Sequence, residues 1–160
     1  MDNVNDKINE LEAILQEGNM VNCPLKHTFA DGQYIREIFM PAGTYVTSLI
    51  HKTKHPFFIL KGKVTVISEN DGEQILEAPY SGITTPNTRR ALYIHEDCIW
   101  ATVHKTNVKP TSESEEDVLT AVALIKDEII DNVDNPLLKG QYVNNKLVES
   151  SNKMVAENIY

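Results

Sequence analysis

The sequence predicts a mainly β protein, folded as a sandwich or jelly-roll barrel. Short apolar stretches follow one another at close spacing between about Phe29 and His104. The segments between them contain Gly, Pro, Asn or Asp, the residues that tight turns favour. Many short strands with such turns are typical of sandwiches and barrels. The chain has 160 residues, 41% of them hydrophobic, which is enough for one barrel with a buried core and appended segments.

The pattern divides the chain into four regions. Residues 1–20 are expected to form an amphipathic helix, and residues 21–105 the barrel. Residues 106–117 read as a polar linker, and residues 118–160 as a helix with a helical or extended tail.

The first helix is predicted over Asp6–Glu17, where apolar residues recur at helical spacing and Gly18 follows as a stop signal. One face of it carries Ile8, Leu11, Ile14 and Leu15. This apolar face has to be covered, either by the end of the barrel or by a neighbouring subunit.

The expected strands each lie between turn signals. They are Gln33–Met40, Thr44–Ile50, Phe57–Leu60, Val64–Ser68, Gln74–Ala78, Ile83–Thr85, Ala91–Ile94 and Cys98–His104. The turns expected between them include Lys61-Gly62-Lys63 and His95-Glu96-Asp97.

A second helix is predicted over Glu116–Asp131, with acidic residues at its start, where the helix dipole favours them. Ser112 and Glu115 have the spacing of a capping box before it. Beyond Pro136 the tail is rich in Asn and Ser yet carries apolar residues at wide intervals. It is either a loosely ordered terminus or an arm that docks on a partner subunit.

The net charge of −8 and the isoelectric point near 5.1 argue against nucleic acid or an anionic membrane as partner. No apolar run is long enough for a membrane helix, and the N-terminus lacks a signal peptide pattern, so we expect a protein that stays in the cytoplasm of the producing cell. Cys23 and Cys98 are expected to be free thiols. Sequence motifs for nucleotide binding, serine hydrolases and zinc knuckles are missing.

A histidine pair, His51 and His55, flanks the basic segment Lys52-Thr53-Lys54. In a hairpin the two side chains would face each other across the turn, within reach of one ligand or ion. In one continuous strand they would lie about 13 Å apart. Pro56 favours the hairpin, because proline belongs at a strand start or edge.

These residues carry a resemblance to a known family. The run Pro41-Ala42-Gly43-Thr44, then His51, His55 and Phe57 to Gly62, resembles the first conserved motif of the cupins. Pro79 to Ala91 is similar to the second cupin motif. The segments HKTKH, PNTRRALY and HEDCIWATVH also look like a group of small cupin-like proteins found in bacteriophage genomes. The resemblance covers about half the chain and implies a cupin-like jelly-roll β-barrel.

Cupin metal sites use three histidines and a glutamate, and this sequence departs from that set. His51 alone occupies a cupin histidine position, whereas Leu49 stands in place of the first histidine. His55 replaces the glutamate, and Ala91 falls near the last histidine. A divalent metal remains possible if His104 joins His51 and His55, because protein metal sites need three or four ligands. His95 is expected to be a turn residue.

A pocket for an organic ligand is the other possibility, with His51, His55, Arg89, Tyr93 and Trp100 as its candidate residues and Arg90 beside them. Arginines would bind an anion as forked donors, and aromatic rings would stack on it. Alternation puts Arg89 and Tyr93 on one face of their strand and Arg90 on the other. One arginine is therefore expected to enter the barrel, while the other meets solvent or pairs with acidic residues of a neighbour.

Three functions stay open. The missing ligands and the appended segments favour a non-enzymatic cupin-like barrel, phage-encoded as the resemblance implies. We expect it to assemble as a homo-oligomer or with other virion proteins, and a place in the virion is the alternative to the cytoplasm. A metal-dependent isomerase or dioxygenase for a sugar or small acid, using His51, His55 and His104, is the first alternative. Binding of a small molecule without turnover is the second.

Overall fold

The computed structural model describes residues 4, 6–8, 10–11 and 21–130. Antiparallel strands make up most of this part, which confirms the mainly β prediction. In chain order they are β1 (Leu25–Ala30), β2 (Gln33–Met40), β3 (Tyr45–Thr47), β4 (His55–Ser68), β5 (Gly72–Glu77), β6 (Tyr80–Thr84) and β7 (Arg90–Lys105), followed by helix α2 (Glu115–Ile129).

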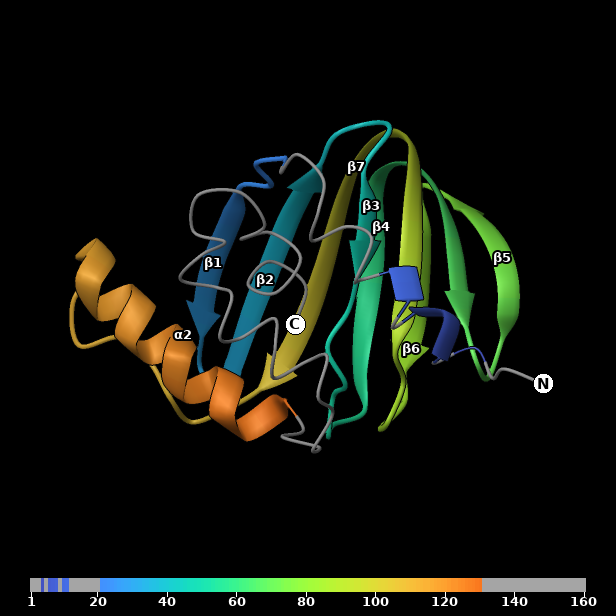
Figure 1. Ribbon diagram of the computed structural model, residues 1–160. Helices are drawn as coiled ribbons and strands as arrows, with labels where there is room; N and C mark the ends of the chain where they lie inside the picture. The colour runs from blue at the N-terminus through green and yellow to red at the C-terminus, as the bar shows by residue number, and fades with distance from the viewer. Residues whose placement is uncertain (1–3, 5, 9, 12–20, 131–160) are drawn as a thin grey trace.

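Two long strands, β4 and β7, run side by side through the whole molecule. The first half of β4 pairs with β6 and with the end of β7. The end of β7 also pairs with β2, and β2 pairs with β1. The second half of β4 pairs with β5 and with the start of β7, which pairs with β3. The strands therefore curl into two layers of a jelly-roll barrel (Figure 1).

The bend between the layers replaces two predicted turns. Lys61-Gly62-Lys63 and His95-Glu96-Asp97 were expected to end strands, and this is wrong, since β4 and β7 each continue through them with shifts of register. Gly62 has a φ of +97°, and a Cβ there would overlap the carbonyl oxygen of Asp97. Glycine is needed because no side chain fits where the two backbones approach so closely.

The remaining strands follow the sequence pattern more closely. β2 spans Gln33–Met40 as predicted, and every second side chain of it is buried. β1 was not predicted. It lies at the edge of the sheet, and its side chains are half-buried or exposed, so its sequence LKHTFA carries no strong apolar alternation. Gly32, with a φ of +73°, makes the turn between β1 and β2 that the sequence indicated.

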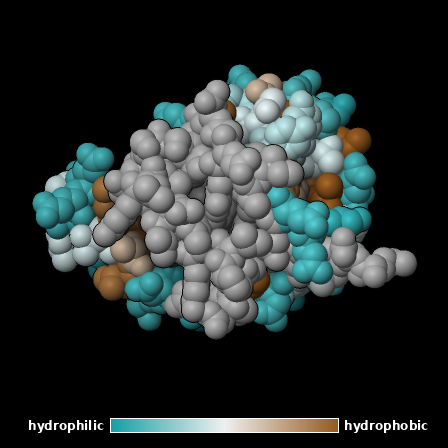
Figure 2. Space-filling view, in the orientation of Figure 1, coloured by the Kyte–Doolittle hydropathy of each residue, from teal (hydrophilic) through white to brown (hydrophobic). Residues whose placement is uncertain are grey.

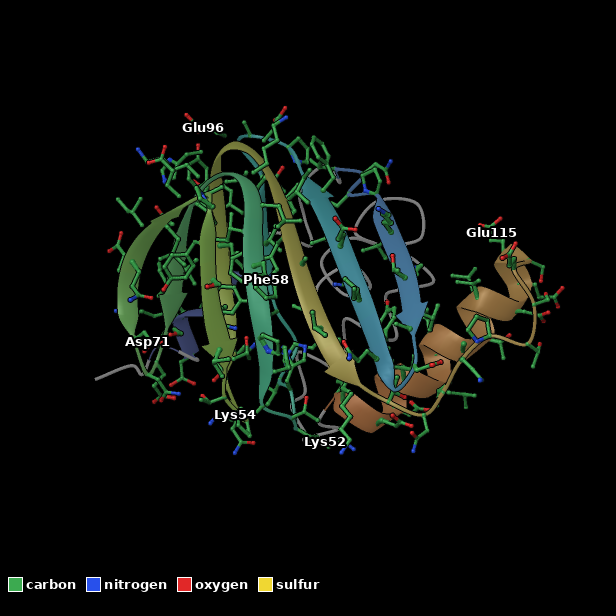
Figure 3. All side chains as sticks on the ribbon, turned by 180° about the vertical axis from the view of Figure 1, so that it is seen from behind. Lys52, Lys54, Phe58, Asp71, Glu96 and Glu115 are labelled. Atoms are coloured by element: carbon green, nitrogen blue, oxygen red, sulfur yellow. The ribbon has the colours of Figure 1, made fainter. Side chains whose placement is uncertain are left out.

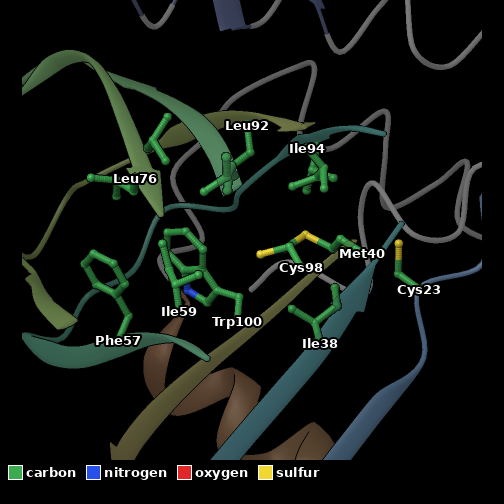
Figure 4. Close-up of a cluster of buried hydrophobic side chains, with 13 residues drawn as sticks. Cys23, Ile38, Met40, Phe57, Ile59, Leu76, Leu92, Ile94, Cys98 and Trp100 are labelled. Atoms are coloured by element: carbon green, nitrogen blue, oxygen red, sulfur yellow. The ribbon is translucent and has the colours of Figure 1, made fainter. Parts of the chain in front are cut away.

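The main core lies between the two layers and is drawn in Figure 4. Its aromatic and aliphatic side chains come from the inward positions of β2, β3, β4, β5 and β7. Cys23 and Cys98 belong to it as buried free thiols, which confirms that prediction. Burial raises the pKa of Cys23 to about 12 and that of Cys98 to about 11, so both thiols stay protonated near neutral pH.

Helix α2 packs against the end of the barrel nearest the start of β2 (Figure 1). Its buried residues Val122, Ile125 and Ile129 contact Tyr34 and Leu49 in a second core cluster. The opposite side of the helix is exposed at Leu119 and Leu124, and apolar residues interrupt the hydrophilic surface there (Figure 2).

The start of α2 differs in detail from the prediction. Ser114, not Ser112, is the N-cap, and its side chain accepts a hydrogen bond from the backbone N–H of Asp117 at 3.2 Å. The Ser112 hydroxyl donates instead to the carboxylate of Asp117. Three acidic residues in the first turn suit the helix dipole as expected.

Parts of the two terminal predictions lie outside the described residues. Residues 4, 6–8 and 10–11 are helical, and Ile8 is buried. The rest of the helix predicted over Asp6–Glu17 and the tail after Ile130 fall outside the described ranges. Within those ranges no helix is long and apolar enough to cross a membrane.

The close approach at Gly62 predicts a large effect of Gly62→Ala on stability. Backbone strain at this φ costs about 1–3 kcal/mol, and the overlap with Asp97 adds to it. Gly43→Ala is the matched control, because Gly43 also has a positive φ, +85°, but has open space around it. Urea unfolding should show the larger loss for Gly62→Ala. Equal losses would mean that the contact with β7 is not what demands glycine.

Candidate functional site

Three histidines meet at the end of the barrel that α2 covers. His51 lies in the segment before β4, His55 opens β4 and His104 lies near the end of β7. The ring centroids are 4.9 Å apart for His51 and His55, 4.4 Å for His55 and His104, and 6.2 Å for His51 and His104. All three side chains are buried.

The hairpin prediction correctly placed the rings of His51 and His55 close together, but it gave the wrong strand pairing. β3 pairs with β7 and not with β4, so the two strands do not form a hairpin. His51 forms an isolated bridge with Ile130, and the backbone N–H of Lys52 donates to the carbonyl of Ile129 at 2.8 Å. The chain nevertheless reverses between the two histidines, and this reversal brings the rings together.

The protonation of these histidines is governed by burial. The pKa of His104 falls to about 2, mainly because of burial, and the neighbouring His55, His51 and Arg36 contribute in the same direction. Burial is also the main reason why the pKa of His55 falls to about 4, with Arg90 contributing in the same direction. Both imidazoles are therefore neutral near pH 7.

The hydrogen bonds of the cluster are local. The Nε2 of His104 is hydrogen-bonded to the hydroxyl of Thr102 at 2.9 Å. Its Nδ1 is buried and has no hydrogen-bond partner among the described residues. The Nδ1 of His55 lies 3.2 Å from the carbonyl oxygen of Thr53. The ring of Tyr34 stacks beside His104, with centroids 6.0 Å apart, and closes the cluster toward β1.

Metal binding by the three histidines stays a prediction. Metal-ligating side chains have to aim their donor atoms at one point about 2.0–2.1 Å from each nitrogen. Among the described residues, no group of three or more His, Cys, Asp or Glu side chains that could hold a metal ion is found. The structure does bring the rings of His51, His55 and His104 together.

A cavity of about 50 Å³ lies beside the histidines, inside the barrel. One water molecule needs about 10–15 Å³ of such space, so the cavity has room for a small ligand. Its apolar lining consists of Ile38, Met40, Val46, Leu92 and Trp100. Its polar lining consists of Arg36, Ser48, His51, His55, Thr84, Arg90 and Thr102. No aspartate or glutamate is among these lining residues.

Arg90 enters the barrel, whereas Arg89, the candidate on the same face as Tyr93, neither lines the cavity nor meets solvent. Arg90 lines the cavity and donates to the hydroxyl of Thr84 at 2.9 Å. Arg89 is buried but does not line the cavity, and its Nε donates to the carbonyl of Ser48 at 3.4 Å. Ser48 fixes both arginines, because its hydroxyl also accepts from the backbone N–H of Arg90.

Of the two aromatic candidates, Trp100 lines the cavity and Tyr93 does not. Trp100 lines the cavity and stacks on Phe57, with ring centroids 4.7 Å apart and planes 8° from parallel. The guanidinium carbon of Arg90 lies 4.9 Å from the centre of the Phe57 ring. Tyr93 lies outside the cavity lining, and its ring packs against Tyr45 at 4.7 Å.

Arg36 is the lining residue that sequence reasoning missed. It lies on β2 between Tyr34 and Ile38, and only 3% of its surface is exposed. The signal was present in QYIREIFM, where alternation places Arg36 on the face of Tyr34, Ile38 and Met40. A charged residue on an otherwise apolar face of a strand indicates a buried polar site.

Comparisons with known proteins find similarity among solved structures alone. No protein-family model and no curated protein matches the chain. Among solved structures, an RmlC-like cupin family protein of Methanocaldococcus jannaschii is similar, with a TM-score of 0.46 and 12% identity over 54% of this chain and 82% of that one.

Two further structures show the same range of similarity. A cupin-2 domain-containing protein of Shewanella frigidimarina has a TM-score of 0.43 and 12% identity over 66% of this chain and 95% of its own. An acetylacetone dioxygenase of Acinetobacter johnsonii has a TM-score of 0.43 and 17% identity over 52% of this chain and 59% of its own. At this level of similarity no residue role passes to this protein.

The buried histidines predict that stability falls in acid. The folded pKa values of His104, His55 and His27 are all below the ordinary value of 6.5, so the unfolded chain binds protons first as pH falls. Each histidine then costs at most about 1.4 kcal/mol per pH unit below pH 6.5. Urea unfolding at pH 7 and pH 5 should show this loss, and His104→Leu should reduce it. A stability that is constant over this range would contradict the burial of the cluster.

Proposed function

We propose that this protein binds a small organic anion inside its barrel. The observation that carries the proposal is the charge of the cavity. Arg36 and Arg90 both line it, whereas its lining contains no carboxylate. Guanidinium groups bind carboxylates and phosphates through paired hydrogen bonds, which are stronger and more directional than bonds between neutral groups.

The polar lining also supports an anionic ligand rather than a cationic one. Burial is the main cause of the low pKa values of His104 and His55, and the positive charges of Arg36 and Arg90 lower them in addition. The imidazoles of His51 and His55 and the hydroxyls of Thr84 and Thr102 would complete a polar site for the charged group.

The apolar part of the cavity lining favours a ligand that also has a hydrocarbon portion. Trp100 and Leu92 contribute side chains that would lie against hydrocarbon, and Trp100 is held in place by its stack on Phe57. The volume of about 50 Å³ restricts the ligand to a few non-hydrogen atoms. A short carboxylic acid with an apolar chain or small ring has these properties.

The neighbouring arginines provide a matched test. A panel of short carboxylates is first screened for an increase in melting temperature, since a ligand that binds the folded state stabilises it. Titration calorimetry with the best ligand should then show that Arg90→Gln weakens binding by about tenfold or more. Arg89→Gln should leave the affinity within a small factor of the original. A panel without effect, or equal losses in both variants, would count against the proposal.

A metal-dependent enzyme that uses His51, His55 and His104 is the alternative, and metal analysis distinguishes it. Anion binding by the two arginines needs no metal ion, so protein purified without a histidine tag is expected to contain well under one equivalent of transition metal per chain. The measurement is elemental analysis of the wild type and of His51→Ala. A stoichiometric metal that is lost in His51→Ala would favour the enzyme.

The assembly role that the bacteriophage resemblance implies stays a prediction. It was based on the N-terminal helix and the C-terminal tail, most of which lie outside the described residues. Anion binding and assembly do not compete for residues, because the cavity lies inside the barrel.

A further inference from the structure

The ring of His55 has one nitrogen whose role is fixed by a backbone carbonyl. Its Nδ1 lies 3.2 Å from the carbonyl oxygen of Thr53, and a carbonyl oxygen can only accept a hydrogen bond. The hydroxyl of Thr53 lies 3.3 Å from the same nitrogen and can accept as well. Nδ1 therefore carries the proton, because the other tautomer would set its lone pair against those of the carbonyl oxygen.

The second nitrogen of the ring, Nε2, is left as a hydrogen-bond acceptor. The imidazole is neutral near pH 7, so a proton on Nδ1 leaves a lone pair on Nε2. Among the described residues, both hydrogen-bonding contacts of His55 are made by Nδ1. Nε2 is not one of the buried polar atoms that lack a partner there, so it touches open space. The open space that His55 lines is the cavity.

The position of Thr53 agrees with this orientation of the ring. Figure 3 shows Lys52 and Lys54, its neighbours in the chain, at the end of the barrel. The two nitrogens of an imidazole point in widely different directions. With Nδ1 turned toward the end of the barrel, Nε2 faces the interior.

The acceptor on His55 lies beside the guanidinium group of Arg90. His55 on β4 is directly opposite Thr84 on β6. The guanidinium of Arg90 donates to the hydroxyl of Thr84 at 2.9 Å. Besides burial, the positive charge of Arg90 lowers the pKa of His55. The cavity thus offers a charged donor and a neutral acceptor next to each other.

We propose that the anion bound in the cavity is a 2-hydroxy acid. This inference rests on the proposed anion binding and assigns the group next to the carboxylate. The carboxylate accepts from Arg90, and the hydroxyl on the neighbouring carbon donates to Nε2 of His55. An ammonium group in that place would also donate, but it would add a second positive charge beside Arg90, which costs affinity. A hydrogen in that place would leave a buried acceptor unpaired.

Three ligands with the same carbon skeleton test this inference. Next to the carboxylate, lactate carries a hydroxyl, propanoate a hydrogen and alanine an ammonium group. Titration calorimetry of the full chain should show that lactate binds about tenfold or more tightly than propanoate, and that alanine binds most weakly. Equal affinities of lactate and propanoate, both reduced by Arg90→Gln, would overturn the inference and leave the proposed anion binding in place. Binding of none of the three would overturn both.

Substitution of His55 tests the assigned acceptor. The preference for lactate over propanoate should fall to about one in His55→Leu, whereas His55→Gln should retain part of it, because its amide oxygen can accept. His95→Leu is the matched control, because His95 is exposed and its Nε2 is hydrogen-bonded to the hydroxyl of Thr65 in the other layer. It should leave the preference unchanged. A preference that survives His55→Leu would overturn the assignment.

The tautomer of His55 can be measured without a ligand and in the unsubstituted protein. Nitrogen NMR of isotope-labelled histidine rings distinguishes a protonated from an unprotonated ring nitrogen. At pH 7 His55 should carry its proton on Nδ1 alone, with its signals assigned by their loss in His55→Gln. A proton on Nε2 would overturn the inference, because the ring would then present a donor to the cavity.

Discussion

The close contact between β4 and β7 at Gly62 is the constraint on which the rest of the structure depends. In a straight strand Arg90 and Trp100 would lie about 33 Å apart, yet both line one cavity of about 50 Å³. Both strands bend at the register shifts around Gly62, so the start and the end of β7 curve around the same space. The cavity therefore exists because the backbones of β4 and β7 approach more closely than any side chain would allow.

Helix α2 adds a second constraint, from outside the barrel. Its last residues hold the segment that carries His51, through the bridge to Ile130 and the hydrogen bond from Lys52 to Ile129. The same turn of the helix packs Ile125 and Ile129 against Tyr34. The polar end of the cavity is thus built from both layers of the barrel and from a helix that follows them in the sequence, so its geometry depends on the whole fold rather than on one motif.

Local sequence patterns predicted much of this fold, because alternation and turn residues act within a few positions. β2 and α2 follow from periodicity, and alternation placed Arg89 and Arg90 on different faces without showing that Arg90 is the one that lines the cavity. The continuity of β4 and β7 could not be predicted, since Gly62 and the segment His95–Asp97 have the composition of turns. Only pairing between residues more than thirty positions apart shows that they are bends. The cavity depends on this non-local pairing, whereas Arg36 could have been placed on the inward face by the alternation within β2.

The two faces of β4 have different surroundings. Phe57 points inward and supports Trp100, whereas Phe58, the next residue, is 36% exposed. Because side chains alternate along a strand, a substitution at Phe58 leaves the lining of the cavity in place. The cavity is therefore sensitive to every second residue of β4 and β7, and to the contact at Gly62 that holds the two backbones together.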